Sequence, residues 1–224
     1  MKKIILLVSI IIFPALLVSQ EKEQTLFGGD SIDIGFYGGP DFKFTVMDDY
    51  FGVFSGGRGG LIFNGYLSVG GAGYNLITNN HHADVIYNGV TETVDINLTY
   101  GGFIFEYINS TNKAFHFTVN SLLGWGIASY YLSRKPFMDG YDIYDRSNFF
   151  VFEPGATLEM NLTKYMRLNI GGSYRIITGS KLGYNVDSDF SGFAVNLGLK
   201  FGFFNKFEIP DEIKEVIKEF KQDE

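Results

Sequence analysis

Three histidines are the side chains of this sequence best suited to acid–base or metal chemistry. His81 and His82 are adjacent and Asp84 follows two residues later, but neighbouring histidines in a loop point in different directions. No third ligand stands at a defined spacing, so we interpret the pair as part of a solvated loop. His116 has no nucleophile or orienting acid at a recognisable spacing, and we interpret it as a hydrogen-bonded interior residue.

Asp139, Asp142 and Asp145 recur every third residue, and their carboxylate oxygens are ligands that would suit calcium. The segment lacks the glycine turn and the bidentate glutamate of a calcium-binding loop. The glycine clusters "GGRGG" and "GGAG" do not match the dinucleotide fingerprint. The sequence therefore predicts no metal site, no cofactor and no catalytic residue, and leaves these histidines and aspartates as candidate contacts of exposed loops.

Charged residues elsewhere occupy alternate positions of apolar stretches. In "YMRLNIGGSYRII", residues 165–177, the polar side chains take the odd positions and the apolar ones take most of the even positions. Such alternation places the charges on one face of a strand. The charged residues predicted to share one face across all strands are Asp33, Asp41, Asp95, Glu153 and Glu159 with Lys43, Arg58, Arg167, Arg175 and Lys200. The five acids and five bases predict that these groups pair with one another.

Composition favours β-structure in one domain. The 224 residues include 28 Gly, 23 Phe and 14 Tyr but only 5 Pro, as expected for aromatic strands joined by turns. Cysteine is absent, which excludes disulfides and thiolate chemistry. The net charge of -7 and the lack of any basic run exclude nucleic acid as a partner.

The two ends of the chain differ from its middle. Two lysines precede an apolar run over residues 4–18, as in a secretory signal peptide, which we place at residues 1–19, with a lead-in over 20–30. Residues 205–224 carry Ile213, Val216, Ile217 and Phe220 at helical spacing. We expect a short amphipathic helical tail in the periplasm, either frayed or covering the mouth of the domain formed by residues 31–204.

Eight stretches of period-two alternation fill residues 31–204. The predicted strands are 31–46, 50–63, 66–78, 92–107, 113–131, 148–162, 165–178 and 189–204. Short connections follow the even strands, and long polar ones follow the third, fifth and seventh. This alternation is typical of a bacterial outer-membrane barrel with short periplasmic turns and long external loops. We predict an all-β, eight-stranded, antiparallel up-and-down transmembrane barrel with a short C-terminal helical tail.

The polar faces decide between a membrane barrel and a soluble one. In a soluble barrel they would meet water and be rich in solvated charge, yet here they mix Gly, Thr and Asn with isolated charges of both signs. An eight-stranded barrel is only wide enough for side chains to fill it, so charges inside it need partners. The sequence therefore predicts apolar faces toward lipid. The rival interpretation, a secreted lipocalin-like barrel with an apolar cavity, requires the reverse polarity.

Two turns predict strand registers. A two-residue hairpin at Asn64-Gly65 would place Phe63 opposite Tyr66 and Arg58 opposite Gly71. The inward glycines would then be Gly56, Gly60 and Gly73, and Phe54, Ile62, Leu67 and Val69 would be apolar inward residues. The turn at Thr163-Lys164 allows two registers. One places Glu159 opposite Arg167, and the other places Glu153 opposite Arg175.

The leader, the eight alternating strands and the aromatic end "NLGLKFGFF" resemble the small outer-membrane barrels of the OmpA, OmpX and OmpW type. The resemblance covers residues 31–204 as architecture and implies insertion into the bacterial outer membrane by the barrel-assembly machinery. In that family the insertion signal is a terminal aromatic residue, whereas here twenty residues follow Phe204.

From the strands and this resemblance together we predict a non-enzymatic surface scaffold or adhesion protein that contacts outer-membrane lipids, including lipopolysaccharide, with its lumen occluded by charged pairs. The alternatives are OmpW-like passage of small or apolar molecules and an enzyme at the external rim that modifies lipid A or cleaves peptides.

Overall fold

A computed structural model describes residues 32–47, 50–78, 80–87, 90–132, 143–181 and 187–204. The predicted signal peptide, the lead-in and the helical tail lie outside these residues. Among the described residues, no helix is long and apolar enough to cross a membrane.

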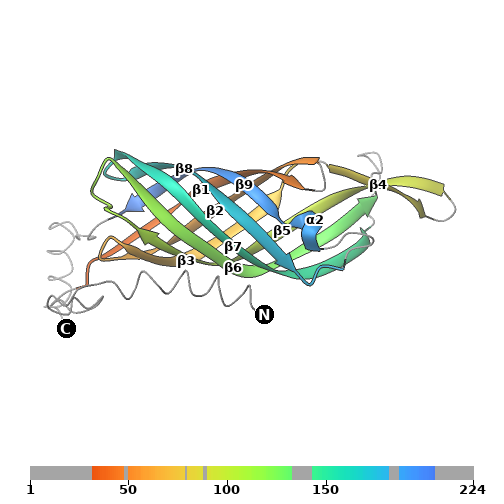
Figure 1. Ribbon diagram of the computed structural model, residues 1–224, viewed down its shortest axis with the longest axis horizontal. Helices are drawn as coiled ribbons and strands as arrows, with labels where there is room; N and C mark the ends of the chain where they lie inside the picture. The colour runs from red at the N-terminus through yellow and green to blue at the C-terminus, as the bar shows by residue number, and fades with distance from the viewer. Residues whose placement is uncertain are drawn as a thin grey trace, which may run out of the picture. The chain divides into compact units, whose positions relative to one another are not determined.

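Eight antiparallel strands close into a barrel, as the alternation of short and long connections predicts (Figure 1). Closure comes from the pairing of the first strand with the last and of β3 with β5. The barrel strands are β1 (Ile34–Met47), β2 (Tyr50–Phe63), β3 (Leu67–Leu76), β5 (Val90–Ile108), β6 (Phe115–Leu132), β7 (Ile143–Thr163), β8 (Met166–Thr178) and β9 (Gly192–Phe203). Each lies within a few residues of its predicted range, and the fold class is confirmed.

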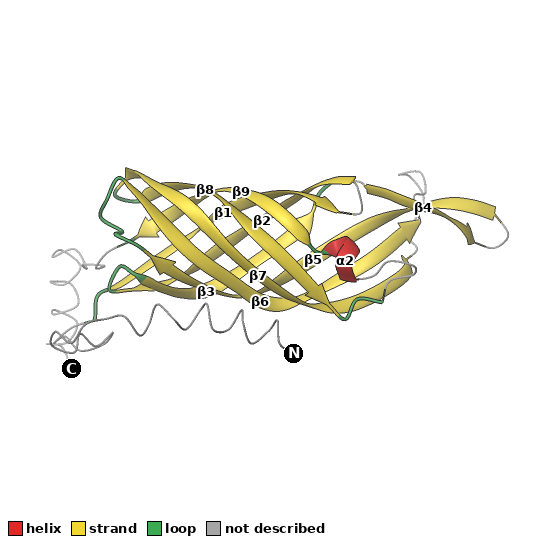
Figure 2. Cartoon of the chain, in the orientation of Figure 1, coloured by secondary structure: helices red, strands yellow, loops and turns green. Residues whose placement is uncertain are grey.

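A ninth strand, β4 (Asn80–Tyr87), occupies a segment predicted to be a loop. It pairs with the first residues of β5 and forms a hairpin that extends beyond the barrel wall (Figure 1). The polar composition of this segment suggested a loop, but Val85, Ile86 and Tyr87 have high strand propensity. The only described helix, α2 (Asp187–Phe190), lies between β8 and β9 at the same end of the barrel (Figure 2).

The turn between β2 and β3 holds three residues, so the predicted register is wrong by one position. Asn64 and Gly65 have φ angles of 51° and 76°, and the Tyr66 amide donates to the Phe63 carbonyl at 3.2 Å. Phe63 therefore pairs with Leu67, and Arg58 with Ala72.

A shift of one residue turns a strand over. Leu67, Val69 and Gly73, predicted to face inward, consequently stand on the outer face of β3, whereas Phe54 and Ile62 on β2 face inward as predicted.

The outer wall is apolar, and this settles the polarity of the sheet. Ile170 and Leu197 are exposed on the outside, while their neighbours Arg167 and Lys200 are buried inside. The other strands follow the same rule, with a belt of exposed aromatic and aliphatic side chains that includes Phe36, Phe103, Phe117, Leu158 and Phe201. Apolar residues outside and ionic ones inside are the arrangement of a barrel built for lipid, and the soluble lipocalin-like alternative is wrong.

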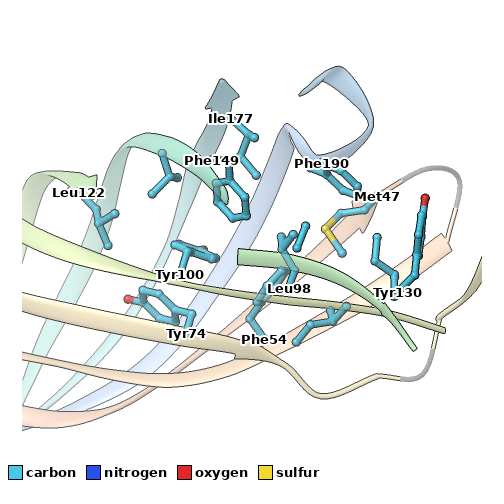
Figure 3. Packing of buried hydrophobic residues seen from close by; sticks show 14 of the residues in the cluster. Met47, Phe54, Tyr74, Leu98, Tyr100, Leu122, Tyr130, Phe149, Ile177 and Phe190 are labelled. Atoms are coloured by element: carbon cyan, nitrogen blue, oxygen red, sulfur yellow. The ribbon is translucent and has the colours of Figure 1, made fainter. Parts of the chain in front are cut away.

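The interior contains two apolar layers. One lies in the half of the barrel near β4 and α2 and includes Phe54, Leu98, Phe149 and Phe190 (Figure 3). The other lies near the short turns and consists of Tyr37, Ile62, Ile108 and Phe204. The buried charges lie mainly between these layers, where water has little access and each charge needs a partner.

Replacing Ile170 by arginine tests which face meets lipid. Ile170 is 51% exposed in the middle of β8. We expect I170R to lower the free energy of unfolding in phosphatidylcholine vesicles by about 2–4 kcal/mol, the cost of a charge on the lipid face near the midplane. Urea titration followed by tryptophan emission measures it. The matched control Y165R, at the rim, should cost about 0–1 kcal/mol. Equal effects would contradict a lipid-facing wall.

Candidate functional site in the barrel interior

The Arg58 guanidinium is the centre of a buried polar network. Its Nη2 lies 3.2 Å from Asp41 Oδ1 and donates to Asn169 Oδ1 at 2.6 Å, and its Nη1 lies 3.4 Å from Glu106 Oε1. Asp41 also accepts a hydrogen bond from the Tyr74 hydroxyl at 2.8 Å. One arginine on β2 therefore joins strands β1, β5 and β8 across the lumen.

Glycines on the inner wall give Arg58 the space to cross. Gly56 and Gly60 flank it on β2, and Gly70 faces Gly60 from β3. A Cβ at Gly56 would lie 2.0 Å from the Gly73 carbonyl oxygen, and one at Gly70 would lie 2.0 Å from that of Gly59. The strands approach too closely here for side chains, which is the physical reason for the "GGRGG" cluster.

Glu106 joins this centre to a second pair of charges. Lys200 Nζ donates to both carboxylate oxygens of Glu106 at 3.1 Å and to Glu159 Oε1 at 2.6 Å. The Tyr37 hydroxyl donates to the other side of the Glu106 carboxylate. All four side chains are buried, so the carboxylates are solvated by protein donors instead of water.

The network continues to the end of the barrel that carries the short turns. Glu159 Oε2 lies 3.3 Å from His116 Nε2 and 3.5 Å from Arg167 Nη1. Arg167 Nη2 donates to Thr111 Oγ1 at 2.6 Å, and its guanidinium stacks on the Phe204 ring at 3.7 Å. His116 has its other ring nitrogen 3.2 Å from the Lys113 carbonyl oxygen, so both nitrogens are engaged.

A second group of charges lies toward the opposite end. Lys43 Nζ donates to Glu153 Oε1 at 2.6 Å and lies 3.7 Å from the centroid of the Tyr74 ring. The Glu153 carboxylate also accepts from the Tyr100 hydroxyl at 2.8 Å and from Ser173 Oγ. Three donors thus surround a carboxylate that is almost completely buried.

Arg175 connects this group to the helix above it. Its Nε donates to the Phe190 carbonyl of α2 at 2.8 Å, and its guanidinium lies 4.7 Å from the centroid of the Phe54 ring. Its Nη1 and Nη2 atoms are buried without a hydrogen-bond partner among the described residues. Arg175 is fully buried, and it holds the β8–β9 connection against the apolar layer.

The register of β7 and β8 is the second of the two predicted. Glu159 lies opposite Asn169 and Gly155 opposite Ser173, which aligns Glu153 with Arg175. The Arg167 side chain still reaches Glu159 by a diagonal contact.

Asp95 was predicted to be one of the interior charges, and this prediction is wrong. It stands on the outer face of β5, because that strand alternates without interruption and its inward positions are the even ones, from Val94 to Glu106. The carboxylate that β5 supplies to the interior is therefore Glu106, which the sequence reasoning missed. The positions of Phe103 and Phe105 could have revealed it. These two aromatic residues mark the apolar, outward face of the strand, and Asp95 shares that face whereas Glu106 lies on the opposite one.

Asp33 lies outside the network. It is half-buried at the rim, where its backbone amide donates to Asn64 Oδ1 at 3.0 Å. The other eight predicted charges are buried in the interior. Within the described residues, the buried charges are Asp41, Glu106, Glu153 and Glu159 with Lys43, Arg58, Arg167, Arg175 and Lys200.

The predicted loop residues are only partly described. His81 and His82 belong to β4 by their backbone. Asp139 and Asp142 lie outside the described residues, and the Asp145 carboxylate accepts the backbone N–H of Arg146 at 2.7 Å. The described residues contain no group of three or more His, Asp or Glu side chains placed to hold a metal ion.

Known structures resemble this barrel, although no protein-family model and no curated protein sequence matches the chain. Neisserial surface protein A superposes with a TM-score of 0.53 at 14% sequence identity, over 78% of this chain and 100% of that protein. The chain has the fold of the small outer-membrane β-barrels.

The N-terminal barrel domain of Pseudomonas aeruginosa OprF aligns at 13% identity over 76% of this chain and 98% of that chain, with a TM-score of 0.46. Ail of Yersinia pestis, solved with a heparin analogue, aligns at 14% identity over 77% and 99%, with a TM-score of 0.45. In an outer-membrane barrel of eight strands, the lumen is just wide enough for side chains to fill. The ion pairs described above occupy that space.

Replacing Glu106 by glutamine tests the importance of the network. The substitution keeps the shape but removes the charge that balances Arg58 and Lys200, so we expect the free energy of unfolding in vesicles to fall by about 3–5 kcal/mol. The control K113Q removes one charge from an exposed position in the β5–β6 turn and should stay within about 0.5 kcal/mol. Urea titration measures both, and a larger effect from K113Q would contradict the assignment.

Proposed function

We propose that the protein is a non-enzymatic surface scaffold of the bacterial outer membrane, inserted by the barrel-assembly machinery, whose external segments contact lipopolysaccharide or outside partners. The observation that carries this proposal is the contrast between a filled interior and a hairpin that extends beyond the wall. A barrel of this kind anchors a surface element and leaves no path for solutes.

Packing supports an occluded lumen. The interior cavity between the charge groups has a volume of about 10 Å³, room for roughly one water molecule. Its lining includes Asp41, Lys43, Arg58 and Glu153. Apolar layers lie on both sides of the charges, so a continuous column of water would have to displace packed side chains as well as ion pairs.

The β4–β5 hairpin supports the scaffold role. Among the described strands, β4 pairs with β5 alone, so its other edge presents backbone N–H and C=O groups. Such an edge can accept an added strand from a partner. The hairpin lies at the end of the long connections, which faces the outside in barrels of this fold. Neisserial surface protein A, which this barrel resembles in fold, is named as a surface protein, and that is consistent with this location.

The alternative functions draw less support from the geometry. The hypothesis that apolar molecules pass through the lumen rested on four apolar residues that were predicted to face inward. Two of them, Leu67 and Val69, face outward in the structure. An enzyme that used His116 would need a free ring nitrogen, whereas both nitrogens contact Lys113 or Glu159. We therefore retain the scaffold proposal.

Single-channel recording tests the occluded lumen. We expect the purified protein in planar phosphatidylcholine bilayers to show no steady conductance, because the charge network and both apolar layers fill the pore. The variant F190A, which removes one side chain of the outer layer, should also stay closed, because the ion pair of Lys43 with Glu153 remains in place. Steady porin-like conductance of the unmodified protein would contradict occlusion.

Protease accessibility on intact cells tests the orientation. A cleavage sequence inserted between Tyr87 and Val90, at the tip of the hairpin, should be cut by protease added outside. The same sequence inserted at the Asn64–Tyr66 turn should be cut only after the outer membrane is permeabilised. The reverse pattern would show that the hairpin faces the periplasm.

A further inference from the structure

An open groove crosses the outer wall near the end that carries the hairpin. Its volume is about 670 Å³, and it lies over β5, β6, β7 and the end of β8. The outward residues that line it are Thr99, Gly101, Trp125, Ile127, Asn148, Phe150 and Thr178. Because these positions share the face that carries the apolar belt, the groove opens toward the surroundings of the barrel and not toward the lumen.

The groove spans a boundary between apolar and polar wall. In its lower row, Gly101, Trp125, Phe150 and Thr178 are neighbours across four strands. The Trp125 and Phe150 rings meet edge to face, with centroids 6.4 Å apart, and Trp125 is 65% exposed. Gly101 lines the groove beside the indole, and a Cβ there would lie 2.8 Å from the Ala72 carbonyl oxygen of β3. This row can hold an acyl chain.

The row above is mostly polar. Thr99, Ile127 and Asn148 are neighbours across β5, β6 and β7, so a hydroxyl and an amide flank one aliphatic side chain. The Asn148 amide can donate to the sugar or ester oxygens of a lipid headgroup, and the Thr99 oxygen, whose hydrogen is donated to Asn75 Oδ1, can accept from a sugar hydroxyl. The lining thus changes from aromatic to polar along the direction in which a lipid changes from tail to head.

Two exposed basic residues stand beyond the polar row. Arg146 precedes Asn148 by two residues on β7, which is one outward position, and Lys181 follows the groove residue Gly179 by two residues. The Lys181 amide donates to Ser147 Oγ at 2.8 Å, which ties the two segments together. Within the described part of the chain, neither side chain forms an ion pair with another described residue.

Three acidic groups lie near this pair, and backbone donors hold two of them. The half-buried carboxylates of Asp145 and Asp187 accept backbone N–H groups, Asp145 from Arg146 and Asp187 from Gly179 and Ser180, while Asp95 lies at the far side of the groove, on β5. The chain as a whole has a net charge of -7, so its general field repels anions. An anionic ligand on this wall therefore requires a local basic pair, and Arg146 with Lys181 supplies one.

We propose that this groove is a binding site for a phosphorylated, acylated glycolipid of the lipid A class. The site rests on the proposed function, because it requires the apolar belt to lie in the membrane. One acyl chain lies along Trp125 and Phe150, the sugar faces Thr99 and Asn148, and a phosphate lies between Arg146 and Lys181. Guanidinium and ammonium groups bind phosphate through charge-assisted hydrogen bonds.

Trp125 is the only tryptophan of the chain, so its fluorescence reports on the groove directly. The experiment adds bis-phosphorylated lipid A to the full protein in phosphatidylcholine micelles and follows the emission of Trp125. We expect a saturable change. Dephosphorylated lipid A should bind the protein roughly thirtyfold more weakly, because about 1 kcal/mol is lost for each of the two basic residues.

The variant R146Q/K181Q should lose the same factor with phosphorylated lipid A. Its matched control is K113Q/K164Q, which removes two exposed positive charges at the opposite end and should bind as the unmodified protein does. Heat-modifiable gel migration checks that each variant is folded. Equal affinity of R146Q/K181Q and the unmodified protein, equal affinity for both lipids, or no saturable change would overturn the proposal.

A second measurement separates this inference from the proposed function. In vesicles of phosphatidylcholine alone, Trp125 should emit at the short wavelengths of an indole among acyl chains, in every variant. Emission typical of an indole in water would contradict membrane insertion itself. Acyl-chain emission without any dependence on lipid A would overturn only the lipid site.

Discussion

Electrostatic neutralisation inside a narrow tube is the constraint on which this structure depends. The wall must be apolar outside, so the charges of the strands are left inside, where eight strands leave no room for bulk water. Each must then find a counter-charge or several donors. Arg58, Glu106 and Lys200 do so by contacts that reach across the lumen, and the glycines beside Arg58 make that reach possible.

The apolar layers add a second barrier to water. Phe190 and its neighbours cover the charges on one side, and Phe204 with Ile62 covers them on the other. Burial between such layers strengthens each ion pair by lowering the local dielectric, and it raises the cost of any unpaired group equally. The anchor role proposed above is consistent with a filled interior of this kind, and under that proposal the outer wall and the hairpin are the surfaces available for binding.

Much of this architecture could be predicted because strand alternation has a period of two and the difference between the faces persists over most strands. Eight of the ten predicted interior charges lie in the lumen, since Arg167, Arg175 and Lys200 stand in strands whose opposite faces are uniformly apolar. The wrong predictions arose where the inward and outward positions of a strand were assigned one residue out of step. One extra residue in the Asn64–Tyr66 turn inverted β3, and choosing Asp95 over Glu106 inverted β5. The β4 hairpin was missed because its polar composition outweighed its strand propensity.

The network draws its members from distant parts of the sequence. Lys43 and Glu153 are 110 residues apart, and Lys200 and Glu106 are 94 apart. Some contacts join neighbouring strands, as Arg58 does with Asp41, but Glu106 and Lys200 meet only across the lumen. Charge compensation is therefore complete only when all eight strands of the barrel are in place.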